Sequence, residues 1–212
     1  MQHTSSHGVD YREGTTTGEI LHWYDLTCPF CYLAQARNQI LLDHDLVVVE
    51  LPFQAHPEIP PDGMYIGPRS GPRYEMIAQE AERAGLPLSW SDRLPNSRRA
   101  LAAAEWVRRS AAEHFPAYQK TLFHAHFAAH EDLGDNEVLI LHAAPFGIDA
   151  LLKETLETDA IFDAVAEVER SGRLAGVNGT PAWLIDGHLV SGLQSPEQFE
   201  RIAATVASLG RS

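Results

Sequence analysis

The sequence predicts an α/β fold in which a small mixed sheet, built from both ends of the chain, is interrupted by a long helical insertion. Three observations support this. Four segments have strand-like sequences, two near the start and two near the end: 20–25, 46–51, 181–185 and 188–192. The stretch between them, 72–172, has the apolar spacing of helices. The only two cysteines, Cys28 and Cys31, stand where the first strand would pass into a helix.

The first half of the expected sheet has a strand–helix–strand pattern. After the strand at 20–25, apolar residues at helical spacing predict a helix over 31–42. Segment 46–51 is a β-branched run, which is typical of a strand buried on both faces in a parallel pair. Prolines and a glycine between 52 and 63 end this regular structure.

The inserted stretch is predicted to fold as consecutive helices. Their expected ranges are 73–84, 97–109, 115–129, 135–144, 148–156 and 158–170. We expect Asn96 or Ser97 to cap the second helix and Thr158 to cap the last, because short polar side chains can accept hydrogen bonds from the first N–H groups of a helix.

The sheet then resumes. Asp186-Gly187 is a two-residue hairpin signal between the last two strands. Ser195 is expected to cap a final helix over 196–209, where apolar residues again recur at helical spacing.

The run Cys28-Pro29-Phe30-Cys31, between a strand and a helix, is the sequence pattern of a thioredoxin-like redox site. Free N–H groups and the dipole at a helix start favour the thiolate, which is the form that attacks disulfides. We therefore expect Cys28 to attack and Cys31 to resolve. Two alternatives remain: a pair of ordinary buried cysteines, or half of a zinc site, although no second ligand pair has the matching spacing.

Composition narrows the possible partners. The 212 residues suffice for one large domain, or one domain carrying an inserted subdomain. Lys and Arg number 16 against 29 Asp and Glu, which gives a net charge of −13 and argues against nucleic acid and anionic membranes as partners. The start lacks the basic and apolar parts of a signal peptide. We expect a cytoplasmic protein with a disordered leader over residues 1–17.

Longer runs around the cysteines support a family resemblance. The run from Asp25 to Ala34 looks like a D-x-x-C-P-W/F-C-Y active-site sequence, and 176–181, Gly-Val-Asn-Gly-Thr-Pro, looks like a cis-proline loop. With weaker landmarks at 52–58 and in the helical stretch, they resemble the DsbA-like thioredoxin family, most closely its cytosolic FrnE-like branch. The resemblance spans residues 18–208.

This resemblance implies a thioredoxin-like α/β fold, a four-stranded mixed sheet with a large helical insertion. We place the split thioredoxin-like domain at 18–55 and 174–212, and the inserted helical subdomain at 56–173.

The resemblance also implies that the Thr180–Pro181 bond is cis and faces the cysteines. The backbone of Thr180 would then pair with an extended substrate and hold its cysteine near Cys28. We expect Pro29, Phe30, Thr180 and Pro181 to bind substrate. The alternative is a trans proline that opens an edge strand.

The sequence departs from the resemblance in two ways. Six residues before the first cysteine, many thioredoxin-like enzymes carry a buried acid that relays protons, whereas this chain has His22. We hypothesise that His22 exchanges a proton as Cys31 reacts; a histidine with satisfied hydrogen bonds in the sheet is the alternative. The dipeptide between the cysteines contains no histidine, so we expect a less oxidising disulfide than in a strong periplasmic oxidant.

Histidines at 124, 126 and 130 are expected on one helix, with His126 and His130 one turn apart. Two histidines in this spacing can share a metal ion, but protein sites need three or four ligands and no third is identifiable. We therefore predict no metal site.

We predict a DsbA-like protein-disulfide oxidoreductase that acts on protein or small-molecule thiols through a mixed disulfide. It would need no dissociable cofactor, with glutathione considered as a co-substrate, and a reductant or oxidant would recycle the cysteines. One alternative is a glutathione-dependent isomerase or transferase, like the related 2-hydroxychromene-2-carboxylate isomerases and kappa-class transferases, which typically carry serine in place of the first cysteine. The other is a non-enzymatic, chaperone-like binding module.

Overall fold

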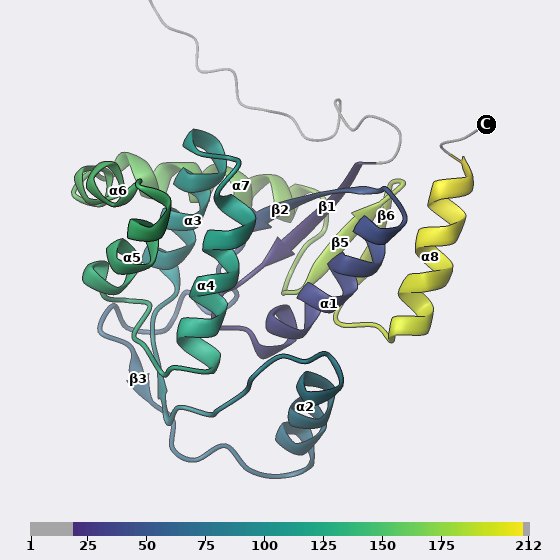
Figure 1. The fold of residues 1–212 in the computed structure, drawn as a ribbon, viewed down its shortest axis with the longest axis horizontal. Coiled ribbons are helices and arrows are strands. Elements are labelled where there is room, and N and C mark those ends of the chain that lie inside the picture. The colour runs from purple at the N-terminus through teal and green to yellow at the C-terminus, as the bar shows by residue number, and fades with distance from the viewer. Residues whose placement is uncertain (1–18, 210–212) are drawn as a thin grey trace, which may run out of the picture.

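The computed structural model describes residues 19–209, so the expected leader lies outside the described residues. Its centre is a four-stranded mixed sheet in the order β2-β1-β5-β6 (Figure 1). The strands are β1 (Glu19–Tyr24), β2 (Val47–Pro52), β5 (Ala182–Ile185) and β6 (His188–Ser191). β1 runs parallel to β2 and antiparallel to β5, and β5 runs antiparallel to β6. Strands from both ends of the chain therefore form one sheet, as predicted.

Helices cover both faces of this sheet because alternate residues of β1 point to opposite sides. Ile20 packs with Leu41 of α1 (Pro29–Asp43) and Phe199 of α8 (Pro196–Leu209). On the opposite face, Leu21 belongs to a cluster with Val168 of α7 (Ala160–Leu174). α1 therefore starts at the sheet and lies directly against it, which places its N-terminal cysteines at the end of β1.

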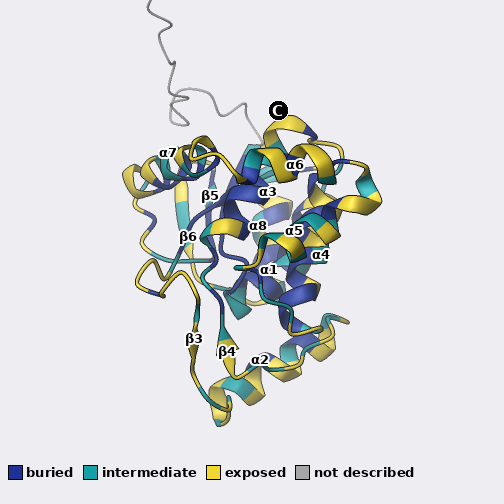
Figure 2. Cartoon of the chain, turned by 90° about the vertical axis from the view of Figure 1, so that its left-hand side faces the viewer, coloured by how far each residue is buried: buried dark blue, intermediate teal, exposed yellow. Residues whose placement is uncertain are grey.

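The insertion packs around α3. Its helices are α2 (Pro72–Arg83), α3 (Arg98–Ser110), α4 (Phe115–Phe127), α5 (Asn136–Ala143), α6 (Asp149–Leu156) and α7, with a 3-10 turn at Ala144–Phe146. Residues 100–104 of α3 are fully buried, and four of the five are alanine, which allows neighbouring helices to approach closely. Figure 2 shows this core in dark blue, whereas α2 and the hairpin β3 (Met64–Tyr65) and β4 (Arg93–Leu94) are largely exposed.

Several local expectations need correction. The last inserted helix, α7, has Asp159 and not Thr158 as its N-cap residue, and it ends at Leu174. The expected domain border at 173/174 therefore falls inside α7, and the division into domains stays a prediction. The β3–β4 hairpin was not expected, because strands of two residues are too short to show periodicity. α4 ends at Phe127, so His130 lies beyond the helix that was expected to carry it.

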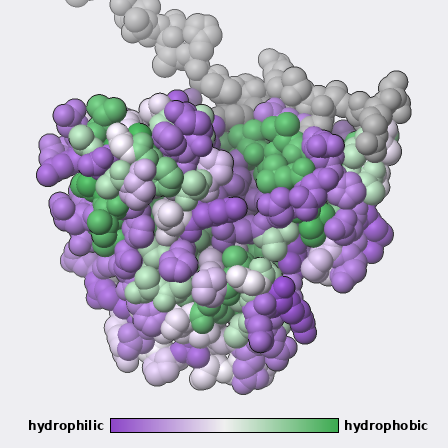
Figure 3. Space-filling view, in the orientation of Figure 1, coloured by the Kyte–Doolittle hydropathy of each residue, from purple (hydrophilic) through white to green (hydrophobic). Residues whose placement is uncertain are grey.

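The face of the molecule seen in Figure 3 is largely polar, with smaller apolar areas. Among the helices of the described part, none has the length and apolar character needed to cross a lipid bilayer.

Candidate active site

The two cysteines occupy different environments at the start of α1. Cys28 is the N-cap residue, with extended backbone angles (φ −83°, ψ 117°), and Pro29 occupies the first turn, where a missing N–H costs no helical hydrogen bond. Cys28 is partly exposed, whereas Cys31 is buried one turn further along; the two sulfurs are not bonded to each other. Only Cys28 can therefore be reached by a substrate from outside.

The pKa values of the two thiols shift in opposite directions. Hydrogen bonds from the Cys31 side chain and backbone lower the pKa of Cys28, against the opposing effects of burial and of the Asp25 charge. Burial above all, and then the neighbouring Cys28, raises the pKa of Cys31 well above its ordinary value. This asymmetry favours a thiolate at Cys28 and a protonated thiol at Cys31, which is the division between attacking and resolving thiols.

The loop before β5 faces the first cysteine. The Thr180–Pro181 peptide bond is cis, as the resemblance implies, and the trans alternative is wrong. The Cys28 thiol lies 3.5 Å from the Thr180 carbonyl oxygen, to which it can donate. The Thr180 hydroxyl is buried without a hydrogen bond of good geometry, yet it is close enough to lower the pKa of both thiols.

A cleft of about 350 Å³ opens beside Cys28. Of the four residues predicted to bind substrate, Pro29, Phe30 and Thr180 line this cleft, whereas Pro181 is buried and does not. Other lining residues come from the insertion, among them Arg69, which precedes α2, and Tyr74 in its first turn. The insertion therefore contributes part of the lining of the cleft beside Cys28.

Asp25 is a site residue that the sequence analysis did not single out. Its Oδ1 accepts hydrogen bonds from the backbone N–H and hydroxyl of Thr27, both at 2.9 Å. Its Oδ2 accepts from the Ala55 N–H at 2.8 Å and the Ser97 hydroxyl at 3.1 Å. The Asp25 backbone N–H also lies 3.4 Å from the Cys31 sulfur. Burial raises the pKa of Asp25, and these hydrogen bonds oppose the rise.

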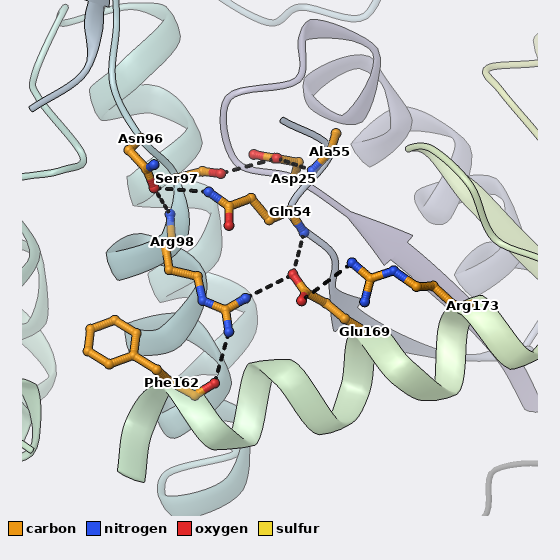
Figure 4. Close-up of polar contacts among 9 residues, drawn as sticks. All are labelled: Asp25, Gln54, Ala55, Asn96, Ser97, Arg98, Phe162, Glu169 and Arg173. Atoms are coloured by element: carbon orange, nitrogen blue, oxygen red, sulfur yellow. Dashed lines mark hydrogen bonds and ion pairs between the residues drawn. The ribbon is translucent and has the colours of Figure 1, made fainter. Parts of the chain in front are cut away.

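Figure 4 shows that these contacts continue into the insertion. Gln54, next to Ala55, bonds Asn96 at 2.9 Å, and its backbone N–H donates to the buried Glu169 of α7 at 3.0 Å. Arg98 of α3 pairs with the same Glu169 oxygen at 2.9 Å. The segment after β2 is thereby held to the insertion and to the loop that precedes the cysteines.

His22 lies in a separate cluster. Its Nδ1 is 2.9 Å from the Asn38 side-chain nitrogen and 3.2 Å from Glu50, and its ring stacks on Trp183 with centroids 4.5 Å apart. Trp183 in turn donates to Asn38 at 2.8 Å. The second ring nitrogen, Nε2, is buried without a partner in the described structure. The described hydrogen bonds of His22 reach neither cysteine.

The histidines considered for a metal do not converge. His126 is buried, and burial, helped by Arg69 and His130, lowers its pKa to about 3. His130 is exposed, and its Nε2 lies 2.8 Å from the Ser89 hydroxyl. Within residues 19–209, no group of three or more His, Cys, Asp or Glu residues is arranged to hold a metal ion.

Known proteins resemble this chain over most of its length. The uncharacterized protein YwbO of Bacillus subtilis (strain 168) is 23% identical over 193 residues, which is 87% of this chain and 95% of YwbO. The structure of a probable DsbA oxidoreductase from Streptomyces coelicolor has a TM-score of 0.77 at 21% identity and covers 90% of each chain.

Two further structures share the fold. The cytosolic disulfide reductase DsbM from Pseudomonas aeruginosa, solved with GSH, has a TM-score of 0.65 at 16% identity, covering 92% of this chain and all of that one (100%). A 2-hydroxychromene-2-carboxylate isomerase has a TM-score of 0.68 at 16% identity, covering 91% and 96% of the two chains. The sequence family described as DSBA-like thioredoxin domain matches residues 19–203. With this match over the whole sheet and insertion, the chain belongs to the DSBA-like thioredoxin domain family.

Proposed function

We propose that this protein is a thiol–disulfide oxidoreductase whose redox pair is Cys28 and Cys31. One observation carries the proposal. Cys28 lies at the start of a helix, lines a cleft and has a lowered pKa, whereas Cys31 is buried one turn further along the helix. Two cysteines with a purely structural role would not need this difference in exposure and in pKa.

The reaction follows from the two roles. The Cys28 thiolate attacks a substrate disulfide R–S–S–R, forms the mixed disulfide Cys28–S–S–R and releases one RS⁻. Cys31 then loses its proton and attacks the Cys28 sulfur, which releases the second RS⁻ and closes the Cys28–Cys31 disulfide. Two electrons pass to the substrate. Because Cys28 reacts as the thiolate, the one protein thiol proton, from Cys31, ends on one RS⁻, and the other RS⁻ remains a thiolate or takes a proton from water. The reverse sequence oxidises a dithiol substrate.

The surroundings suggest how substrate and protons are handled. An extended substrate would pair with the Thr180 backbone and contact Pro29 and Phe30, with Pro181 holding the loop in place. For the Cys31 proton, the hypothesis from the sequence names His22; its described hydrogen bonds reach neither cysteine, and the variant discussed below decides between a proton-transfer role and a structural role. Protein or small-molecule thiols are the proposed substrates, and glutathione, which is present in the DsbM structure, is the proposed small co-substrate. We propose a cytoplasmic location, where a cellular reductant or oxidant recycles the pair.

The test is the reduction potential of the cysteine pair. The protein is equilibrated with defined glutathione ratios, thiols are alkylated, and their number is counted by mass. We expect an intramolecular disulfide that disappears in both Cys28→Ser and Cys31→Ser. A potential near about −270 mV indicates a reductase, and one between about −120 and −200 mV an oxidase or isomerase of disulfides.

The opposite result has a clear meaning. If no intramolecular disulfide forms at any ratio, the redox proposal fails. The glutathione-dependent isomerase then becomes the leading function, and a chromene isomerisation assay tests it directly.

A further inference from the structure

Two arginines of the insertion line the cleft beside Cys28. Arg69 precedes α2, and Arg73 lies in its first turn. The guanidinium carbon of Arg73 is 5.2 Å from the ring centre of Phe30, inside the Cys-Pro-Phe-Cys run. That of Arg69 is 5.1 Å from the ring centre of Trp90. Aromatic rings thus position both cations at the cleft.

Neither arginine is neutralised by an acidic side chain of the described residues. By contrast, Arg83 of α2 and Arg37 of α1 both pair with Glu80 of α2. The Nε atom of Arg69 is also buried without a hydrogen-bond partner, which is an unfavourable state for a charged donor. Two unpaired cations in one cleft are unexpected in a chain of net charge −13.

Two other titratable side chains at the cleft, Asp25 and His56, already have hydrogen-bond partners within the protein. Asp25 lines it, but both of its carboxylate oxygens accept two hydrogen bonds each. His56 also lines it and contacts Glu58 at 2.8 Å. The two arginines therefore remain as the groups with free capacity for an anion.

We propose that Arg69 and Arg73 form a subsite for a carboxylate of a small acidic disulfide or thiol whose sulfur reacts at Cys28. Guanidinium groups bind carboxylates through paired N–H donors, which suits this chemistry. The cleft of about 350 Å³ has the size of a small-molecule site, which favours a low-molecular-weight substrate over a protein segment. The inference rests on the proposed redox function and names its substrate class.

The experiment compares three disulfides of different charge with the reduced protein: glutathione disulfide, neutral bis(2-hydroxyethyl) disulfide and cationic cystamine. Each rate is divided by the rate of the same disulfide with free dithiothreitol, which removes its intrinsic reactivity. We expect normalised rates to fall in the order anionic, neutral, cationic. Arg73→Gln should lower the ratio of anionic to neutral rates about tenfold, the effect of losing one charge-assisted hydrogen bond.

Charge reversal sharpens the test. Arg73→Glu should lower that ratio further and raise the normalised rate for cystamine. Arg73 is exposed, so its replacement does not disturb the core, and Arg69→Lys keeps a charge near Trp90 while losing paired donation. Arg83→Gln, on the same helix but outside the cleft, is the matched control and should leave the ratio unchanged.

A binding measurement separates the two proposals. S-methylglutathione cannot exchange disulfides, so calorimetric titration reports the subsite alone. Binding that is lost in Arg73→Glu supports the subsite, even if no disulfide is reduced and the redox function fails. If the protein reduces the neutral disulfide but shows no charge order, and no arginine variant changes binding, the subsite is overturned while the redox function stands.

Discussion

One buried polar cluster surrounds His22 in β1 and another surrounds Asp25 directly after β1, and they differ in how completely their hydrogen bonds are satisfied. In the Asp25 cluster, four donors from three segments of the chain occupy both carboxylate oxygens. In the His22 cluster, one ring nitrogen is bonded and the other has no partner in the described structure. The Asp25 cluster contacts the Cys31 sulfur through its backbone N–H, whereas the described contacts of His22 are with Asn38, Glu50 and Trp183.

The difference shows that a residue's position six places before the first cysteine does not by itself make it act on the thiols. His22 occupies the position from which a proton-relaying acid was expected, yet its polar contacts bind α1 to the sheet. Asp25, only three residues before Cys28, supplies the negative charge that opposes the Cys28 thiolate. We therefore expect changes in the Asp25 cluster to alter thiol chemistry, and changes in the His22 cluster to alter mainly stability.

The largest effect is expected for Asp25→Asn. Whichever oxygen is replaced, the amide nitrogen would face two donors, so two hydrogen bonds are lost and the free energy of unfolding falls by roughly 2–4 kcal/mol. Removing the negative charge should also lower the Cys28 pKa further, which raises the thiolate fraction at neutral pH. Urea denaturation measures the first effect, and the pH dependence of iodoacetamide alkylation measures the second.

Ser97→Ala is the matched control, because it removes a single donor to Asp25 and leaves the charge in place. It should cost about 1 kcal/mol and leave the Cys28 pKa near its wild-type value. An unchanged Cys28 pKa in Asp25→Asn would show that the carboxylate does not govern the thiol.

The buried side chain of His126, which belongs to neither cluster, is expected to make the stability of the protein depend on pH. Burial lowers its pKa from 6.5 to about 3, so the unfolded chain binds a proton that the folded chain excludes between these values. Stability from this group is therefore full above about pH 6.5 and is lost as the pH falls towards 3. At pH 4 the loss is about 3 kcal/mol. His126→Leu should remove most of this pH dependence in urea denaturation.

His124→Leu is the control for this prediction, since His124 is exposed on the same helix. It should retain the acid sensitivity of the wild type. Equal acid sensitivity in the wild type and in His126→Leu would contradict the prediction and direct attention to the His22 cluster.

An intermediate effect is expected for His22→Ala. Loss of the stacked ring over Trp183 should lower the free energy of unfolding by roughly 2 kcal/mol. Because no described contact joins His22 to the cysteines, we expect the pH profile of disulfide exchange to keep its midpoint and slope. A changed slope, with rates restored by His22→Asp, would instead support the proposed proton transfer to or from Cys31.

The elements that periodicity identified were those with long regular patterns or strong local signals. The sheet strands, the cysteine-bearing helix and the final helix follow from apolar spacing and from the Asp186-Gly187 turn, and they are confirmed. Thr158 was the wrong cap: its hydroxyl donates to the Thr155 carbonyl oxygen of the preceding turn, and Asp159 takes the N-cap position. The cis bond at Thr180–Pro181 came from family resemblance, since local sequence does not distinguish it from a trans proline.

The parts of the site that the sequence did not predict are those assembled from segments far apart in the chain. Thr27, Ala55 and Ser97 meet at Asp25 only after the insertion has packed on the sheet. Arg69 likewise becomes part of the cleft through its place over Trp90. One local signal was available: an acidic residue three positions before the first cysteine, at the end of a buried strand, where an isolated charge is costly and needs partners.

The smallest effect on stability, and the most informative one for the cysteines, is expected for Thr180→Val. Valine keeps the branched shape and removes a buried hydroxyl that lacks a good hydrogen bond, so the protein should become more stable by about 1 kcal/mol. The same hydroxyl lowers the pKa of Cys28, so its loss should raise that pKa and slow alkylation at neutral pH. Thr180→Ser, which retains the hydroxyl, should react at the wild-type rate. A variant that gains stability while losing thiolate would indicate that the hydroxyl is kept for chemistry at Cys28, whereas unchanged alkylation would assign Thr180 a role through its backbone alone.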